Sequence, residues 1–210
     1  MKKYIWLNPV VLKMYDQEEV TSHLTNLGFE IITCVENHID IVKKKYSEQQ
    51  KGCPGLLCDS RCPKAISYVK DHYDSDHLEY ASIYPILIHC AIELAERYKD
   101  EEAKVYIITP CTDLRDQGNG LNLKNTVFQT WTQFCLQHRI MPQCKVVENS
   151  PIPPGFFDNI SNVVSLGSKN DIDCYFKDSC RGSNQLVEML YCQGGCHNGD
   201  GVKVVYEKLD

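Results

Sequence analysis

The most informative stretch of this chain is EMLYCQGGCHNGDG, residues Glu188–Gly201. It carries two thiols, Cys192 and Cys196, separated by three residues of which two are glycines. Glycine tolerates a positive φ and has no side chain, so such a loop can press its backbone against a bulky inorganic group. Zinc thiolates are usually two residues apart, and redox disulfides favour C-x-x-C. The spacing therefore favours iron–sulfur ligation, and a glycine-rich surface turn with two free cysteines is the alternative.

Composition limits the class of protein. The chain has 210 residues, enough for one α/β unit or two small lobes, and its net charge of -6 argues against a nucleic-acid surface, which needs clustered Lys and Arg. No stretch reaches the roughly 18 apolar residues of a membrane span. There are 12 cysteines, and no secretory leader pattern precedes them. We therefore expect a cytoplasmic protein with a metal or cluster site in place of disulfides.

Strand-like and helix-like segments alternate along most of the chain, which predicts an α/β fold with mainly parallel strands. Strands are expected at 4–7, 30–35 and 103–108, and helices at 16–27, 39–46, 64–72, 85–98 and 125–138. We expect a turn at 118–120, an extended connection at 149–157, and a short strand or helix end at 186–190. Ligands in such folds bind beyond the carboxyl ends of strands. The loops at Cys62, Cys111 and Cys192 follow strand-like or apolar runs, so they can converge.

Three loops together carry a resemblance to a known family. They are SRCP at 60–63, TPCT at 109–112, and the stretch 188–199. In this order they resemble the three signature loops of the iron-only ([FeFe]) hydrogenase catalytic domain. Segments 27–30, 40–42, 82–85 and 151–157 also resemble parts of that family, so the likeness covers nearly the whole chain. It implies a single domain over 1–210, made of two Rossmann-like lobes with mainly parallel sheets and an iron–sulfur cluster in the cleft between them.

The resemblance also implies a set of ligands. In that family four thiolates hold a [4Fe-4S] cubane, and one of them bridges to a two-iron subcluster where the hydrogen chemistry occurs. Carried over, the four are Cys62, Cys111, Cys192 and Cys196, with Cys196 at the bridging position. Four thiolates, one per iron, is the number that a cubane requires. His197 can hydrogen-bond a cluster sulfur, or it can be a solvent-facing loop histidine.

Several positions depart from the family pattern. Active enzymes have a proton-relaying cysteine before the first ligand, and here that position is Arg61, which cannot be deprotonated in a protein. They have a lysine three residues after the second ligand, where it holds a cyanide of the diiron unit, and here Leu114 offers no donor. Thr109 replaces a methionine, and Asp200 interrupts the glycine run. These departures argue against the diiron subcluster and leave the cubane ligands intact.

The function that follows is a cytoplasmic [4Fe-4S] hydrogenase-like protein for electron transfer or for redox or gas sensing, acting through a redox partner protein. Two alternatives stay open. One is a minimal iron-only hydrogenase that reduces protons to hydrogen. The other is a scaffold for iron–sulfur cluster assembly, a role found in a eukaryotic branch of the family. Whether the protein is an enzyme is left open by the sequence.

The remaining cysteines offer further possibilities. Cys53 and Cys58 can contribute to a second cluster or metal site together with another thiol, for which the candidates are Cys34 and Cys90. The alternative is that these are buried or incidental cysteines.

Three more cysteines lie in the second half of the chain. Cys174 and Cys180 are expected in a polar, exposed loop, where they can bind a metal, form a redox-sensitive pair or do neither. Cys135 lies on an apolar helical face and is expected in the core.

Overall fold

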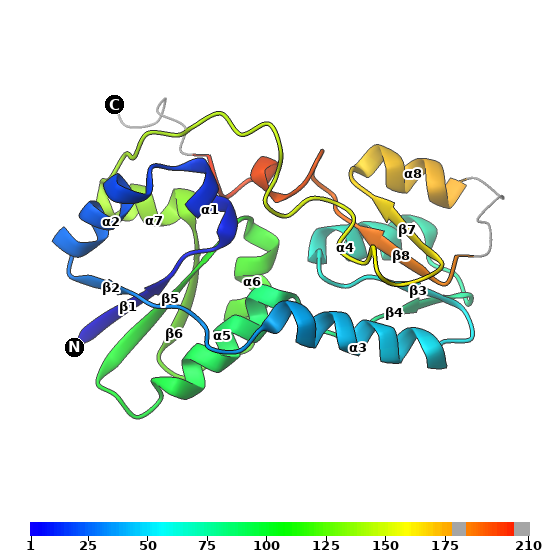
Figure 1. Cartoon of the computed structure of the whole chain (residues 1–210), viewed down its shortest axis with the longest axis horizontal. Helices are drawn as coiled ribbons and strands as arrows, with labels where there is room; N and C mark the ends of the chain where they lie inside the picture. Colours follow the sequence, from blue (N-terminus) through cyan, green and yellow to red (C-terminus); the bar gives the residue numbers. More distant parts are fainter. Residues whose placement is uncertain (178–183, 204–210) are drawn as a thin grey trace. The chain divides into compact units, whose positions relative to one another are not determined.

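The computed structural model of the chain describes residues 1–177 and 184–203. The chain divides into two compact units, each built on one sheet (Figure 1). The first unit comprises Met1–Glu36, Leu87–Pro151 and the described part of Cys196–Asp210, and the second comprises Asn37–Ile86 and Ile152–Gly195. The chain therefore leaves the first unit and returns to it twice.

The first unit has a four-stranded sheet in the order β2-β1-β5-β6, in which all pairings are parallel. Two helices, α5 and α6, pack on one face of the sheet, and the helices α1, α2 and α7 lie on the other (Figure 1). The bounds are β1 Lys2–Trp6, α1 Pro9–Met14, α2 Gln17–Asn26, β2 Phe29–Ile31, α5 Ile86–Arg97, β5 Ala103–Thr109, α6 Thr112–Gly120, β6 Thr126–Thr130 and α7 Trp131–His138.

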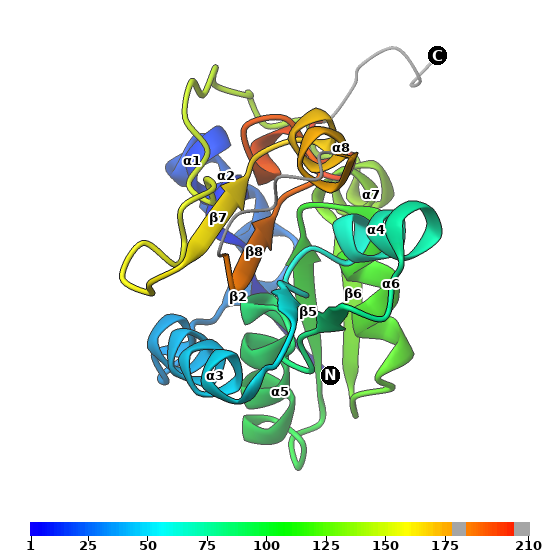
Figure 2. The same ribbon diagram turned by 90° about the vertical axis from the view of Figure 1, so that its right-hand side faces the viewer.

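The second unit has a four-stranded sheet in the order β4-β3-β8-β7, again with parallel pairings throughout. The helix α3 covers one face, and α4 and α8 cover the other (Figure 2). The bounds are α3 His38–Gly52, β3 Leu56–Cys58, α4 Pro63–Tyr73, β4 Leu78–Tyr80, β7 Val163–Leu166, α8 Lys169–Lys177 and β8 Leu186–Met189.

The strand β8 is buried along its whole length, as expected for a central strand covered on both faces. Successive side chains of a strand point to opposite faces. Val187 and Met189 pack with α4 and α8, and Leu186 packs with residues of α3. Glu188 therefore faces the α3 side, where it is fully buried. This places a carboxylate inside the second unit just before the cysteine loop.

The prediction of an α/β fold with two lobes and parallel sheets is confirmed. Most segments also match, although β2 is shorter than the expected strand at 30–35 and α3 is longer than the expected helix at 39–46. The segment 186–190, left open between strand and helix end, forms β8.

Two local predictions were wrong. The segment 125–138 is a strand followed by a helix, because Thr130 ends β6 and starts α7 with a capping box that includes Gln133. The expected turn at 118–120 is instead the last part of α6. Within α6, a Cβ at Gly118 would lie 2.3 Å from the ring of Phe128, so this glycine serves close packing of α6 on β6.

Among the described residues, no helix combines the length and the apolar character that crossing a membrane requires.

Candidate functional site

In the second unit, two of the proposed ligands lie at the same edge of the sheet. Cys62 follows β3 and directly precedes α4, and Cys192 follows β8. Since β3 and β8 are parallel neighbours, their carboxyl ends meet, and the amide of Asp59 extends the ladder by donating to the carbonyl of Val187 at 2.9 Å. The backbone amide of Tyr191 hydrogen-bonds the Cys62 sulfur. The fold thus brings the loops of Cys62 and Cys192 together.

The Cys62 thiol is protonated at neutral pH in the metal-free protein. Burial raises its pKa to about 11, although the amides of Tyr191 and Ala65 pull in the opposite direction. Both amides point at the sulfur and would stabilise a thiolate there. A metal ion deprotonates a coordinating thiol, so loading of a metal at Cys62 would release a proton.

In the first unit, the other two proposed ligands are joined by a glycine contact. Cys111 follows β5 and precedes α6, while Cys196 begins a short 3₁₀ turn, η1, over Cys196–Asn198. A Cβ at Gly199 would lie 2.4 Å from the carbonyl oxygen of Pro110 and 3.1 Å from that of Cys196. Only glycine allows this approach, so the backbones beside Cys111 and Cys196 meet at Gly199.

The loop between Cys192 and Cys196 has the backbone that the sequence suggested. Gly194 has φ 70° and Gly195 has φ 119°, conformations that other residues rarely adopt. The amide of Gly194 donates to the carbonyl of Gly167 at 2.9 Å, and the amide of Gly195 to that of Cys192 at 3.0 Å. These bonds hold a tight turn between the two thiols.

His197 is 9% exposed, so it is not a solvent-facing histidine. Its Nε2 lies 3.1 Å from the amide nitrogen of Asn198. No described residue hydrogen-bonds its buried Nδ1. If Asn198 donates to Nε2, then Nδ1 carries the proton and remains a donor beside Cys196. A buried donor without a protein acceptor suits a hydrogen bond to cluster sulfur, the possibility raised by the position of His197 directly after Cys196.

Arg61 is held in the second unit by two fully buried carboxylates. Its guanidinium pairs with Asp59 at 2.8 Å and with Glu188 at 2.7 Å. It also stacks on Phe156 and Phe157, with its central carbon 3.9 Å and 4.4 Å from the two ring centroids. Burial disfavours the charged form, but the two carboxylates outweigh this effect and raise the pKa of Arg61 above its usual value. Arg61 is therefore a permanent, fixed cation.

The Pro-rich segment 149–157 helps to hold the Glu188 carboxylate that pairs with Arg61. The amides of Gly155 and Phe156 donate to the Glu188 carboxylate at 2.8 Å and 3.1 Å, and the Ser165 hydroxyl donates to it at 2.6 Å. With Arg61, these donors occupy the acceptor sites of Glu188. The sequence predicted an extended connection here and a family likeness over 151–157, but it did not predict the bonds to Glu188.

The other departures from the family pattern also have local explanations, all in the first unit. Leu114 is 7% exposed and belongs to an apolar cluster that includes Ile107 and Phe128. Thr109 is fully buried, and its hydroxyl donates to the carbonyl of Cys111 at 2.9 Å. Asp200 accepts from the amide of Thr112 at 3.0 Å and from its hydroxyl at 2.6 Å. Asp200 therefore caps α6, whose N-cap residue Cys111 makes no side-chain cap.

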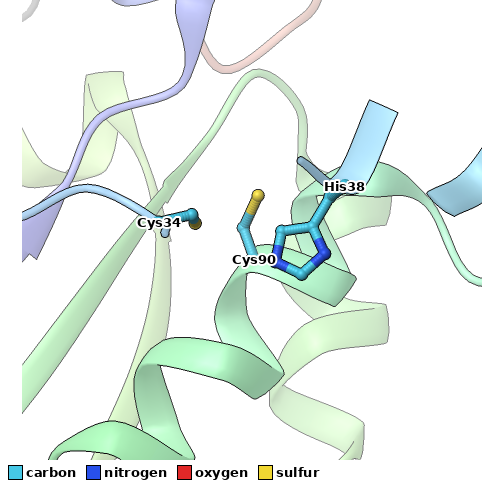
Figure 3. Close-up of side chains that lie close together, drawn as sticks. All are labelled: Cys34, His38 and Cys90. Atoms are coloured by element: carbon cyan, nitrogen blue, oxygen red, sulfur yellow. The ribbon is translucent and has the colours of Figure 1, made fainter. Parts of the chain in front are cut away.

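A second group of ligand atoms involves Cys34 and Cys90. In Figure 3 these thiols and the His38 ring are close together, and their ligand atoms all lie within 4.8 Å of one another. The Cys90 thiol hydrogen-bonds the Cys34 sulfur, which lowers the pKa of Cys34 and raises that of Cys90. The sequence had named both cysteines only as possible companions of Cys53 and Cys58, and it did not name His38 at all.

The other cysteines are placed individually. Cys58 is fully buried in the core against α4, and the Cys53 thiol donates to the carbonyl of Gly55 at 3.3 Å. Over residues 1–177 and 184–203, neither belongs to a group of three metal-capable side chains. Cys135 is fully buried, as expected. Cys174 is exposed as predicted but lies in α8, not in a loop, and Cys180 is outside the described residues.

Comparison with known proteins supports the fold. No family model matches the chain, and no curated protein sequence matches it. Among solved structures, the chain is similar to apo [FeFe]-hydrogenase HydA1 from Chlamydomonas reinhardtii, variant C377H, with a TM-score of 0.59. The match covers 98% of this chain and 80% of that one at 12% identity. The fold is similar to that of an [FeFe]-hydrogenase.

This hydrogenase-like fold agrees with the resemblance seen in the three loops, and the Cys34–His38–Cys90 group gives the chain a metal-capable site besides them. At this level of identity the likeness concerns the fold alone. Assignment of Cys62, Cys111, Cys192 and Cys196 to a cluster stays a prediction, as does the expectation of a single hydrogenase-like domain over 1–210.

Proposed function

We propose that Cys62, Cys111, Cys192 and Cys196 bind one [4Fe-4S] cluster, and that the protein is a hydrogenase-like redox protein without the diiron hydrogen-activating unit. Its role would be electron transfer or redox or gas sensing, in the cytoplasm and through a partner protein. When bound, such a cluster supplies one-electron transfer at a potential set by its surroundings.

Three features of the chain support the cluster. The donor set is four thiols, two of them in each unit. The turn at Gly194 and Gly195 and the contact at Gly199 bring backbone close to these thiols. The buried Nδ1 of His197 and the amides of Tyr191 and Ala65 are donors of the kind that hydrogen-bond cluster or cysteine sulfur.

The observation that argues most strongly against hydrogen chemistry is the buried group of charged side chains around Arg61. Proton transfer needs a group that both takes up and releases a proton. Arg61 cannot do so, because it is held charged by Asp59 and Glu188 and is covered by two aromatic rings. The Leu114 side chain, packed in an apolar cluster, offers no hydrogen-bond donor in place of the family's lysine.

The deciding experiment measures iron, acid-labile sulfide, EPR and infrared spectra on one anaerobically reconstituted sample. We expect about four irons per chain, a cubane EPR signal on reduction, and no carbonyl or cyanide bands after exposure to a diiron maturation system. About six irons together with those bands would instead establish the diiron unit and overturn the proposal. Absence of any iron–sulfur chromophore would reject the cluster itself.

Single substitutions assign the ligands. Cys111→Ser in the first unit and Cys192→Ser in the second should each abolish or strongly reduce cubane content. Cys144→Ser is the matched control, because Cys144 is an exposed thiol of the first unit outside the ligand set. Equal cluster content in Cys192→Ser and in the control would remove Cys192 from the site.

A further inference from the structure

The segment before α3 is tied to α5 within the first unit. The Glu93 carboxylate accepts from the amides of Val35 at 2.9 Å and Glu36 at 3.2 Å. Arg97 donates to the carbonyl of Thr33 at 2.8 Å and also pairs with Glu93. These bonds fix the short stretch that contains Cys34 against the helix.

Cys90 lies on the same face of α5 as these two anchors. Cys90, Glu93 and Arg97 are spaced three and four residues apart, which places them in a row along one side of a helix. The anchors therefore hold Cys34 opposite Cys90, and both are thiols and not a disulfide. Cys90 is 6% exposed and Cys34 is half-buried, so the pair is sheltered but reachable by a small ion.

His38 adds a nitrogen ligand to the two sulfurs. It begins α3 and follows Cys34 with the spacing Cys-x3-His, and it is 9% exposed. The ligand atoms lie within 4.8 Å of one another. A tetrahedral zinc ion, with Zn–S of about 2.3 Å and Zn–N of about 2.0–2.1 Å, needs neighbouring ligand atoms roughly 3.5–3.8 Å apart. Side-chain rotations that shift the ligand atoms by about an ångström would bring them to the separations that zinc requires.

We propose that Cys34, Cys90 and His38 bind one Zn²⁺ ion, with a water molecule as the fourth ligand. Two thiolates and one imidazole form a donor set that zinc takes in proteins. The nearby Glu93 carboxylate is engaged by the two amides and by Arg97, so it holds the site in place and is not itself a ligand. Binding would release one proton from each of the two thiols. None of these three residues is a proposed cluster ligand.

The test is residue-resolved protection from alkylation. Anaerobically reconstituted protein is treated with a thiol-alkylating reagent with and without one equivalent of Zn²⁺, and the modified cysteines are identified by peptide mass spectrometry. We expect Zn²⁺ to protect Cys34 and Cys90 together and to leave Cys144 unchanged. Added Co²⁺ should give thiolate-to-cobalt charge-transfer absorption at one ion per chain.

Substitutions then identify the ligands. His38→Ala removes a direct ligand, so it should weaken zinc binding by more than the roughly 10–100-fold that follows loss of a group supporting a ligand. Cys34→Ser should remove the protection of Cys90, whereas Cys144→Ser should change nothing. The proposal is overturned if Zn²⁺ leaves the alkylation of Cys34 and Cys90 unchanged in the unsubstituted protein, or if these two are isolated as a disulfide that excludes the ion. Neither outcome depends on how the variants fold, and neither bears on the [4Fe-4S] proposal.

Discussion

Arg61 in the second unit and Leu114 in the first stand where the resemblance expects a relaying cysteine and an anchoring lysine, yet their surroundings are opposite. Arg61 is buried between Asp59 and Glu188. Leu114 is buried in an apolar cluster that includes Ile107 and Phe128. A buried cation needs several well-placed partners, whereas a buried leucine needs only space of the right shape.

The difference shows two ways in which the fold accommodates a residue that departs from the family pattern. In the second unit the loop is organised around the new charge, since Tyr46, Ser165 and the amides of Gly155 and Phe156 all bond to the carboxylates that hold Arg61. In the first unit the position has joined the ordinary core. Replacing Arg61 by the family's cysteine would leave buried carboxylates without their cation. We therefore expect a larger loss of stability from substitution at Arg61 than at Leu114.

The largest effect is expected for Arg61→Met. This change leaves Asp59 and Glu188 as neighbouring buried carboxylates without a cation, and breaking a buried pair in this way costs about 3–5 kcal/mol. The measurement is the free energy of unfolding by urea. Arg61→Lys keeps the charge but cannot pair with both carboxylates in the same geometry. Its free energy of unfolding should lie between those of the unsubstituted protein and Arg61→Met. Equal stability of Arg61→Met and the unsubstituted protein would mean that the charge cluster does not organise the loop.

Leu114→Ala should have the next largest effect. Removal of a leucine side chain from a packed core costs about 2–5 kcal/mol, and we expect the lower half of that range because Leu114 keeps 7% of its surface exposed. Urea unfolding of Leu114→Met, which nearly conserves volume, provides the control and should lose less than about 1.5 kcal/mol. A similar loss of unfolding free energy in Leu114→Ala and Leu114→Met would show that the shape of the side chain, and not its buried volume, sets the stability at this position.

Asp200→Ala tests a third kind of departure, in which the residue acts at the surface as a helix cap. Loss of the bonds to the amide and hydroxyl of Thr112 should cost about 1 kcal/mol of unfolding free energy. Asp200→Asn keeps an acceptor and should cost less. If instead the alanine variant is unchanged in stability and binds more cluster, the carboxylate opposes the cluster and its capping role is minor.

The smallest effect concerns pH and the first unit. Burial among the rings of Phe29 and Phe134, with the nearby charge of Lys3, lowers the pKa of His138. The unfolded chain binds the proton more readily, so the stability from neutral His138 is complete above pH ~6.5 and declines as the pH falls below that value. Unfolding free energies across this range should show a shallower decline in His138→Phe. Identical slopes would assign the pH response to other groups.

Much of the candidate site was visible in the sequence because the chemistry sits in short loops. The Cys-x3-Cys spacing with its glycines, the order of the three loops, and the unusual residues Arg61, Leu114 and Asp200 needed no structure to be noticed. The boundary inside 125–138 was missed because its apolar residues fit a helical stripe. Two signals argued against a continuous helix over 125–138. They are the β-branched pair Thr126 and Val127 and the Thr130-x-x-Gln133 capping pattern.

The sequence by itself determined the alternation of strands and helices and the parallel sheets, since these follow from local patterns. The choice of four thiols as cluster ligands came from the family resemblance and stays a prediction. Only the tertiary structure decided what surrounds them. Arg61 meets Glu188 because β3 and β8, far apart in the chain, are neighbours in one sheet. Cys34 meets Cys90 because Glu93 and Arg97 fasten a loop to α5. Such contacts depend on strand order and helix packing, which bring together residues that are distant in the sequence and that no local pattern connects.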